Sequence, residues 1–97
     1  MLKSIHSARQ ERLIALLKQA RRAAGLTQDQ LALRMGADRG FVSKYERGER
    51  RLDVIEFMAV TDALGIDPAA ILAELGAIPR RKRYSVVREI GIDQQPP

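Results

Sequence analysis

The side chains with the most binding chemistry lie in and just after residues 39–47. The inward positions of this segment are Val42 and Tyr45, at the i, i+3 spacing of a helix, and its outward positions include hydrogen-bond donors. An arginine at the start of such a segment can donate two hydrogen bonds to guanine N7 and O6 in the major groove of DNA, and a lysine can donate in that groove as well. The donors are Arg39, Ser43, Lys44 and Arg47, followed by Arg50 and Arg51.

Catalytic chemistry has little support in the sequence. His6 is the only histidine and there is no cysteine. We find no Ser/His/Asp set, no carboxylates paired for acid–base work and no glycine-rich phosphate loop. The lack of cysteine also excludes disulfides and thiolate metal sites. We therefore expect a binding protein and not an enzyme, with no cofactor and no bound metal.

Two short helices joined by a tight turn are predicted to position these donors. Thr27 can cap a helix over 28–35, through a capping box with the glutamine three residues later. Gly36 can end that helix, because glycine readily adopts the left-handed conformation of a sharp stop. Asp38 is predicted to cap the second helix, over 39–47, at once. This arrangement is a helix-turn-helix, whose second helix can enter a DNA major groove.

Capping residues and glycines divide the rest of the chain into three further helices. They are predicted over 8–24, over 54–64 and over 68–75, with Ser7, Asp53 and Asp67 as their respective caps. The fold class is therefore all-α, a compact five-helix domain spanning 1–78. A basic C-terminal tail, 79–97, follows it, and the β-branched content of this tail favours a short strand.

Three segments, GLTQDQLALRMG, VSKYERGER and ALGID, resemble the phage-repressor/Cro-type helix-turn-helix family, also called the xenobiotic-response-element family. The resemblance spans about Leu13 to Leu72, so it includes the flanking helices. It implies a lambda-repressor-like DNA-binding domain and a sequence-specific regulator of transcription that binds double-stranded DNA.

The resemblance also implies roles for individual residues. It places Gln28 against the DNA backbone or the outermost base pair, and Thr27 can donate to the same phosphate as the first amides of its helix. The base-reading positions are Arg39, Gly40, Ser43 and Lys44, and the next backbone contacts fall at Arg47, Arg50 and Arg51. Gly40 departs from the polar residue usual in the family, which removes one reader and costs ~1 kcal/mol within a helix.

Two further residues of the same region are assigned structural roles. In the family, an arginine four residues before the first glycine stop pairs with the glutamate that closes the recognition helix. In this chain that pair is Arg21 and Glu46, which we interpret as a buried ion pair. Phe41 is expected either to touch a thymine methyl group or to pack on the domain.

Charge is distributed unevenly along the chain, whose net charge is +5. Residues 1–51 carry +7, residues 52–78 carry −5 and residues 79–97 carry +3. A basic half beside an acidic half suits a protein that presents one face to a polyanion, although a mixed solvated surface would give the same totals. No apolar stretch reaches the ~18 residues needed to span a bilayer, and no signal peptide is visible, so we expect a cytoplasmic protein without membrane contact.

The helix over 54–64 is apolar on most sides, so it requires burial on most sides. The residues expected to face the core are Val54, Phe57, Met58, Thr61 and Leu64. Ile55, Ala59 and Ala63 form a second stripe, which either a second subunit or the tail would cover. A homodimer with this stripe as its interface would read a palindrome and repress a promoter by covering it.

The sequence leaves two features with more than one interpretation. The basic run at 80–83 is expected to be a solvated linker or a contact to the DNA backbone, and a strand in the tail 79–97 could pair with its own copy in a dimer. The alternative function is an antitoxin that binds a toxin protein and also represses its own operon, because the tail and the apolar helix would suit such a partner.

Overall fold

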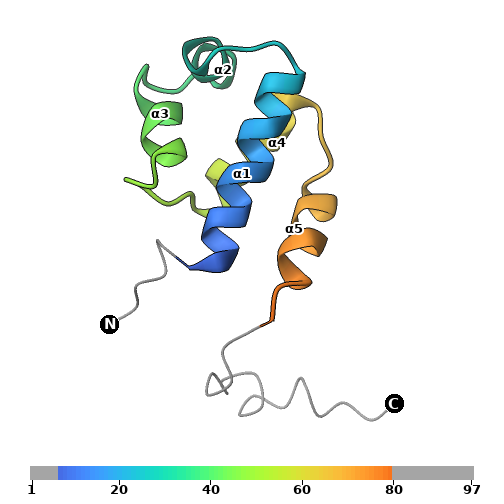
Figure 1. Ribbon diagram of the computed structural model, residues 1–97. Coiled ribbons are helices and arrows are strands. Elements are labelled where there is room, and N and C mark those ends of the chain that lie inside the picture. Colours follow the sequence, from blue (N-terminus) through green and yellow to red (C-terminus); the bar gives the residue numbers. More distant parts are fainter. Residues whose placement is uncertain (1–6, 80–97) are drawn as a thin grey trace.

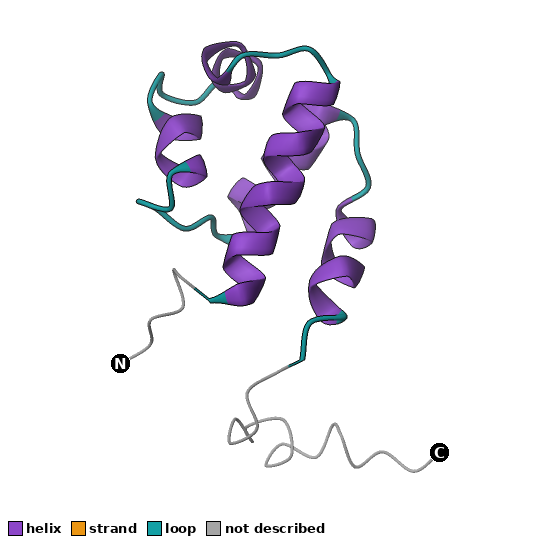
Figure 2. Cartoon of the chain, in the orientation of Figure 1, coloured by secondary structure: helices purple, strands orange, loops and turns teal. Residues whose placement is uncertain are grey.

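Five helices make up the part of the chain that the computed structural model describes, residues 7–79. They are α1 (Ala8–Ala23), α2 (Gln28–Met35), α3 (Phe41–Glu46), α4 (Val54–Leu64) and α5 (Pro68–Gly76). Loops and turns alone connect them within this range (Figure 2). The prediction of an all-α, five-helix domain is thus confirmed, whereas the strand predicted in the tail and the basic run at 80–83 lie outside the described residues.

Helix α1 is the central element of the domain. It packs against α3, α4 and α5, while α2 packs against α3 and α4. Figure 1 shows α3 and α5 on opposite sides of α1, with α2 beyond the C-terminal end of α1. Each helix contributes to one largely aliphatic core, which consists of Leu17, Leu31, Ala32, Val42, Tyr45, Phe57, Val60 and Ile71. The core therefore holds α3 against α1, and it holds α2 against α3 and α4.

The predicted capping boxes set the start of α2 and α4. The Thr27 hydroxyl accepts a bond from the Gln30 amide at 3.0 Å, and the Gln30 side chain accepts one from the Thr27 amide at 2.9 Å. Asp53 and Glu56 repeat this reciprocal pair at 2.7 and 2.9 Å. Each box satisfies amides that precede the first intrahelical bond. Both helices begin where the sequence predicted.

Helix α3 starts later than predicted, and Asp38 is not its cap. The helix begins at Phe41, with Gly40 at the N-cap position and no side-chain capping bond. The backbone carbonyl of Asp38 instead accepts a bond from the Phe41 amide at 3.0 Å, which closes a turn. Gly40 has φ −84° and ψ 2°, away from helical values, in keeping with the weak helix propensity of glycine. Because Gly40 lies outside the helix, the predicted propensity cost does not arise.

The buried face of α4 also differs in part from the prediction. Phe57, Val60 and Thr61 are buried, whereas Val54 and Met58 are 70% and 43% exposed. The prediction was therefore wrong for Val54 and Met58 and omitted Val60. A helix that is apolar on nearly every side gives no unambiguous inner face from periodicity alone. The Thr61 hydroxyl is satisfied within the helix, because it donates to the Met58 carbonyl at 3.0 Å.

Candidate nucleic-acid interface

The turn between α2 and α3 has a fixed geometry. Gly36 ends α2 in the left-handed conformation, with φ 72°, and the Ala37 amide donates to the Ala32 carbonyl at 2.9 Å. Ala32 is 1% exposed, and its small side chain allows α2 and α3 to approach closely. Val42 and Tyr45 anchor the inner side of α3 in the core. The outer side of α3 is thus left facing away from the domain.

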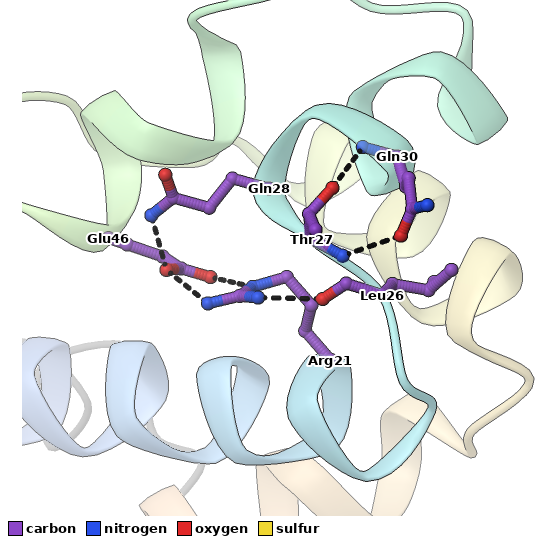
Figure 3. A network of polar contacts seen from close by, with 6 residues as sticks. All are labelled: Arg21, Leu26, Thr27, Gln28, Gln30 and Glu46. Atoms are coloured by element: carbon purple, nitrogen blue, oxygen red, sulfur yellow. Dashed lines mark hydrogen bonds and ion pairs between the residues drawn. The ribbon is translucent and has the colours of Figure 1, made fainter.

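A buried ion pair joins the end of α1 to the end of α3 (Figure 3). Arg21 Nε and Nη2 donate to the two oxygens of Glu46 at 2.8 and 3.1 Å, and the side chains are only 9% and 2% exposed. This hydrogen bonding raises the pKa of Arg21. Arg21 Nη1 also donates to the Leu26 carbonyl at 2.7 Å, so the same guanidinium holds the α1–α2 connection.

Gln28, the first residue of α2, belongs to the same network. Its Nε2 donates to Glu46 Oε1 at 2.9 Å, and Figure 3 shows its amide oxygen pointing away from that carboxylate. A carboxamide nitrogen carries two hydrogens, so one N–H is left to donate elsewhere. The carboxylate accepts hydrogen bonds only and therefore fixes the orientation of the carboxamide. Gln28 and α3 are positioned relative to each other through one buried group.

The start of α2 leaves backbone donors available beside Gln28. The first intrahelical bond runs from the Leu31 amide to the Thr27 carbonyl at 3.0 Å, so the amides of Gln28 and Asp29 precede it. Such amides and the helix dipole together favour an anion at this end of the helix. The Thr27 hydroxyl, which accepts the Gln30 amide, retains its own proton for donation.

Two of the predicted DNA-contacting arginines lie on the surface and pair with nearby carboxylates. Arg39, in the turn before α3, donates through Nε to Asp29 Oδ2 at 3.0 Å. Arg47 donates through Nε and Nη2 to the two oxygens of Glu49 at 2.8 and 3.0 Å. This hydrogen bonding raises the pKa of Arg47 and lowers that of Glu49.

Arg50 is held more firmly, between α3 and α4. Its Nη1 and Nη2 donate to Glu56 at 2.8 and 2.7 Å, and its guanidinium lies 4.8 Å from the centre of the Phe41 ring. The bond from Arg50, together with the Asp53 amide, lowers the pKa of Glu56 to about 2. Phe41 in turn meets Tyr45 edge to face, with ring centres 5.7 Å apart. The phenylalanine therefore packs on the domain, one of the two roles expected for it.

The remaining predicted contact residues lie along α3 and in the loop after it. Lys44 is exposed, and its Cε would lie 3.8 Å from a Cβ placed on Gly40. The Ser43 hydroxyl donates to the Gly40 carbonyl at 3.1 Å. Arg51 is exposed, and its carbonyl accepts a bond from Arg50. The Lys44 side chain, from the last turn of α3, thus lies near Gly40 at the N-cap of the same helix.

The carboxylate partners of these arginines were not predicted from the sequence. Arg47 and Glu49 are two residues apart, and their bond forms where the chain turns after the end of α3, which spacing alone does not reveal. Asp29 and Arg39 are brought together by the turn between α2 and α3, which spacing does not reveal. The same applies to Gln28, whose bond to the end of α3 depends on how two helices cross.

Within 7–79, no group of three or more histidine, cysteine, aspartate or glutamate side chains could hold a metal ion. In the same range, no helix has the length and apolar character needed to cross a membrane.

A short helix that presents donors outward and packs its inner face on a preceding helix through a glycine turn defines a helix-turn-helix DNA-binding domain. The helix-turn-helix family model HTH_3 matches residues 17–71, which is more than half of the chain. The chain belongs to this Cro/C1-type family of DNA-binding regulators of transcription.

Two solved structures are similar to this chain over most of their own length. An XRE-family like protein from Pseudomonas syringae pv. tomato str. DC3000 is 52% identical, with a TM-score of 0.72, and the match covers 80% of this chain and 95% of that one. The restriction-modification controller protein C.AhdI from Aeromonas hydrophila is 32% identical, with a TM-score of 0.62, and the match covers 67% and 98%. No curated protein matches the chain.

Proposed function

We propose that this chain is a repressor that binds a palindromic operator as a homodimer, with the segment 39–47 in the major groove. The observation that carries the DNA-binding part of the proposal is the buried Arg21–Glu46 pair, which, with the bond from Gln28 to Glu46, joins α1, α3 and the start of α2. Base reading is assigned to Arg39, Gly40, Ser43 and Lys44. Backbone contacts are assigned to Thr27, Gln28, Arg47, Arg50 and Arg51.

These two groups contribute differently to binding. Backbone contacts set the position of the protein on the duplex, and base contacts distinguish one sequence from another. The Gln28 side chain is bonded to Glu46 at the end of α3, so a phosphate bound at the start of α2 would set the depth of α3 in the groove. Arg47 can exchange its exposed carboxylate partner for a phosphate.

The outer face of α4 supports the homodimer. Val54, Ile55 and Met58 are exposed on this face, and Leu72 of α5 is exposed as well. A two-fold contact brings the same patch of each subunit together, so one apolar face suffices for a dimer. Of the interface residues predicted with Ile55, Ala59 is partly buried and Ala63 packs against the core. We therefore place Ile55 at the centre of the proposed contact.

Selection from random duplex DNA at physiological salt tests the operator, because phosphate-only binding is weak under these conditions. The proposal predicts enrichment of a palindrome with half-sites about 34–36 Å apart, together with a dimer in light scattering. Enrichment of a single short site by a monomer would contradict the homodimer. No enrichment at all would contradict sequence-specific repression.

The exposed apolar face of α4 also suits a second candidate, an antitoxin that holds a toxin protein there and represses its own operon. This candidate predicts that a toxin co-expressed with the chain protects the face formed by Val54, Ile55 and Met58 from hydrogen exchange. Self-association through the same face, with no stable partner, would favour the homodimeric repressor.

A further inference from the structure

The ion pair between Asp29 and Arg39 includes one of the residues assigned to base reading, Arg39. Asp29 is the second residue of α2, and Arg39 belongs to the turn that leads into α3. The bond of 3.0 Å between Arg39 Nε and Asp29 Oδ2 therefore spans the two elements of the helix-turn-helix. The two side chains are 88% and 56% exposed, so the pair is open to an incoming ligand.

The bond to Asp29 leaves the two terminal nitrogens of the Arg39 guanidinium able to donate to a ligand. The guanidinium carries one N–H on Nε and four on the two terminal nitrogens. Only Nε is bonded to Asp29, and within residues 7–79 no hydrogen bond engages Nη1 or Nη2 of Arg39. Two parallel donors are the group that reads the N7 and O6 acceptors of guanine.

The other paired arginines of this surface are held in a different way. Arg47 uses one terminal nitrogen as well as Nε on Glu49, and Arg50 uses both terminal nitrogens on Glu56. A base could reach the full terminal fork of either arginine only after displacing its carboxylate. Arg39 can receive a guanine while it keeps its bond to Asp29.

We propose that Asp29 is a positioning residue that holds the Arg39 guanidinium ready to read one guanine. An arginine loses much rotational freedom when it binds, and a side chain already held in place loses less. Oδ2 accepts from Nε alone and so leaves both terminal nitrogens able to donate to a base. This inference rests on the proposed function, because it needs Arg39 to enter the major groove.

The negative charge of Asp29 gives the inference a distinctive consequence. A carboxylate near DNA repels phosphates, so its removal raises affinity for unrelated DNA. Loss of the bond to Arg39 at the same time lowers the preference for guanine at one base pair. Asp29 also favours the start of α2 through the helix dipole, but a loss of helix stability would not change a base preference.

The test uses the full chain and the operator enriched in the selection experiment. Affinities are measured for the operator and for versions in which each base pair in turn is replaced. We expect Asp29→Ala to reduce the preference for one guanine by about two- to fivefold, the range of exposed charge pairs, and to leave other positions unchanged. Asp29→Asn, which keeps an acceptor oxygen but loses the charge, should retain part of that preference.

Asp38→Ala is the matched control, because Asp38 is an exposed carboxylate next to Arg39 in sequence and shows no side-chain bond in the described range. It should raise affinity for unrelated DNA without altering the guanine preference. In an Arg39→Ala background, Asp29→Ala should change no base preference. Thermal unfolding of each variant shows that the compared proteins are folded.

The outcomes separate this inference from the proposed function. If the wild-type chain selects an operator but Asp29→Ala keeps the full guanine preference, the positioning role is overturned and the repressor is retained. The same holds if Asp38→Ala lowers that preference equally, since charge alone would then explain the effect. If the wild-type chain selects no sequence, the proposed function and this inference both fail.

Discussion

The ion pairs of this domain differ in value because they differ in burial. Arg21 and Glu46 are almost completely enclosed, so the loss of one leaves the other as an unpaired buried charge. Arg47 and Glu49 are both more than half exposed, and water and salt screen their attraction. Two carboxylates only a few residues apart in the chain thus have unequal roles: Glu46 holds helices together, and Glu49 occupies a surface arginine.

Replacement of Glu46 by alanine is predicted to destabilise the domain by about 3–5 kcal/mol. The variant leaves the Arg21 guanidinium buried without its partner and also removes the acceptor for Gln28. Urea unfolding measures the change in the free energy of unfolding. Glu49→Ala is the control, because the exposed pair should leave the unfolding midpoint nearly unchanged. Equal midpoints for the two variants would show that the buried pair does not anchor α3.

Tyr45 has a hydroxyl that the domain does not satisfy. The side chain is fully buried, and its oxygen has no hydrogen-bond partner among the described residues. A buried unsatisfied polar group costs about 1–3 kcal/mol, so Tyr45→Phe is predicted to raise the free energy of unfolding by about 1 kcal/mol at pH 7. Urea unfolding measures this change in the free energy of unfolding. A destabilised variant would indicate that the hydroxyl has a partner in solution.

The same tyrosine predicts how stability depends on alkaline pH. Burial raises the pKa of Tyr45 above its ordinary value of 10.0, so the folded state keeps a proton that the unfolded chain releases. The ionisation of Tyr45 therefore leaves the free energy of unfolding unchanged below pH 10 and lowers it as the pH rises above 10. We expect the advantage of Tyr45→Phe over the wild type to grow between pH 9 and pH 11. A constant difference across that range would refute the assignment.

At the scale of the elements, a capping residue predicted the start of a helix correctly where no nearby glycine opposed it, and incorrectly where a glycine followed it. Thr27 and Asp53 each cap a helix through a partner three residues ahead, so the sequence alone locates the starts of α2 and α4. Asp38 carries the same type of signal, but Gly40 follows it within what would be the first turn. The glycine favours a turn there, and the helix begins after it.

The glycines at the two ends of this turn should respond to substitution in opposite ways. Gly40 has a negative φ and room for a Cβ, so Gly40→Ala is predicted to stabilise the domain by about 0.5 kcal/mol through the unfolded state. Gly36 has φ +72°, so Gly36→Ala should destabilise it by about 1–2 kcal/mol, although no atom lies within 4 Å of the added Cβ. Urea unfolding of the two variants measures the two changes in the free energy of unfolding. A loss of stability in both variants would mean that Gly40 also needs a conformation special to glycine.

At the scale of the whole molecule, the sequence predicted the fold class and most helix bounds but few of the contacts between helices. The Arg21–Glu46 pair was inferred through family resemblance, whereas the bonds of Gln28 to Glu46 and of Arg39 to Asp29 were not. These bonds depend on how α2 and α3 cross, which no local pattern encodes. The inner face of α4 was partly misjudged for a related reason, since its apolar residues lie on both sides of the helix.

The exposed outer face of α4 determines how the proposed homodimer should respond to an added charge. Ile55 is 74% exposed, and Val54 and Met58 lie beside it on the same helix. In the proposed homodimer, a glutamate at position 55 would meet its own copy across the two-fold axis and place two like charges in an apolar contact. Ile55→Glu is therefore predicted to reduce the measured mass from near twice the chain mass of 10.9 kDa to a single chain. Operator affinity should fall by about a hundredfold, because two linked half-site contacts become one.

Leu33→Glu is the matched control for this change. Leu33 is 81% exposed on α2, so it offers an equally exposed apolar side chain that lies outside the proposed contact. Light scattering should find the Leu33 variant still dimeric, with thermal unfolding close to that of the wild type for both variants. If both variants dissociate equally, the loss of the dimer is not specific to Ile55, and if the Ile55 variant stays dimeric, the dimer axis does not pass through this face of α4. The two α3 helices would then have to be paired by another surface.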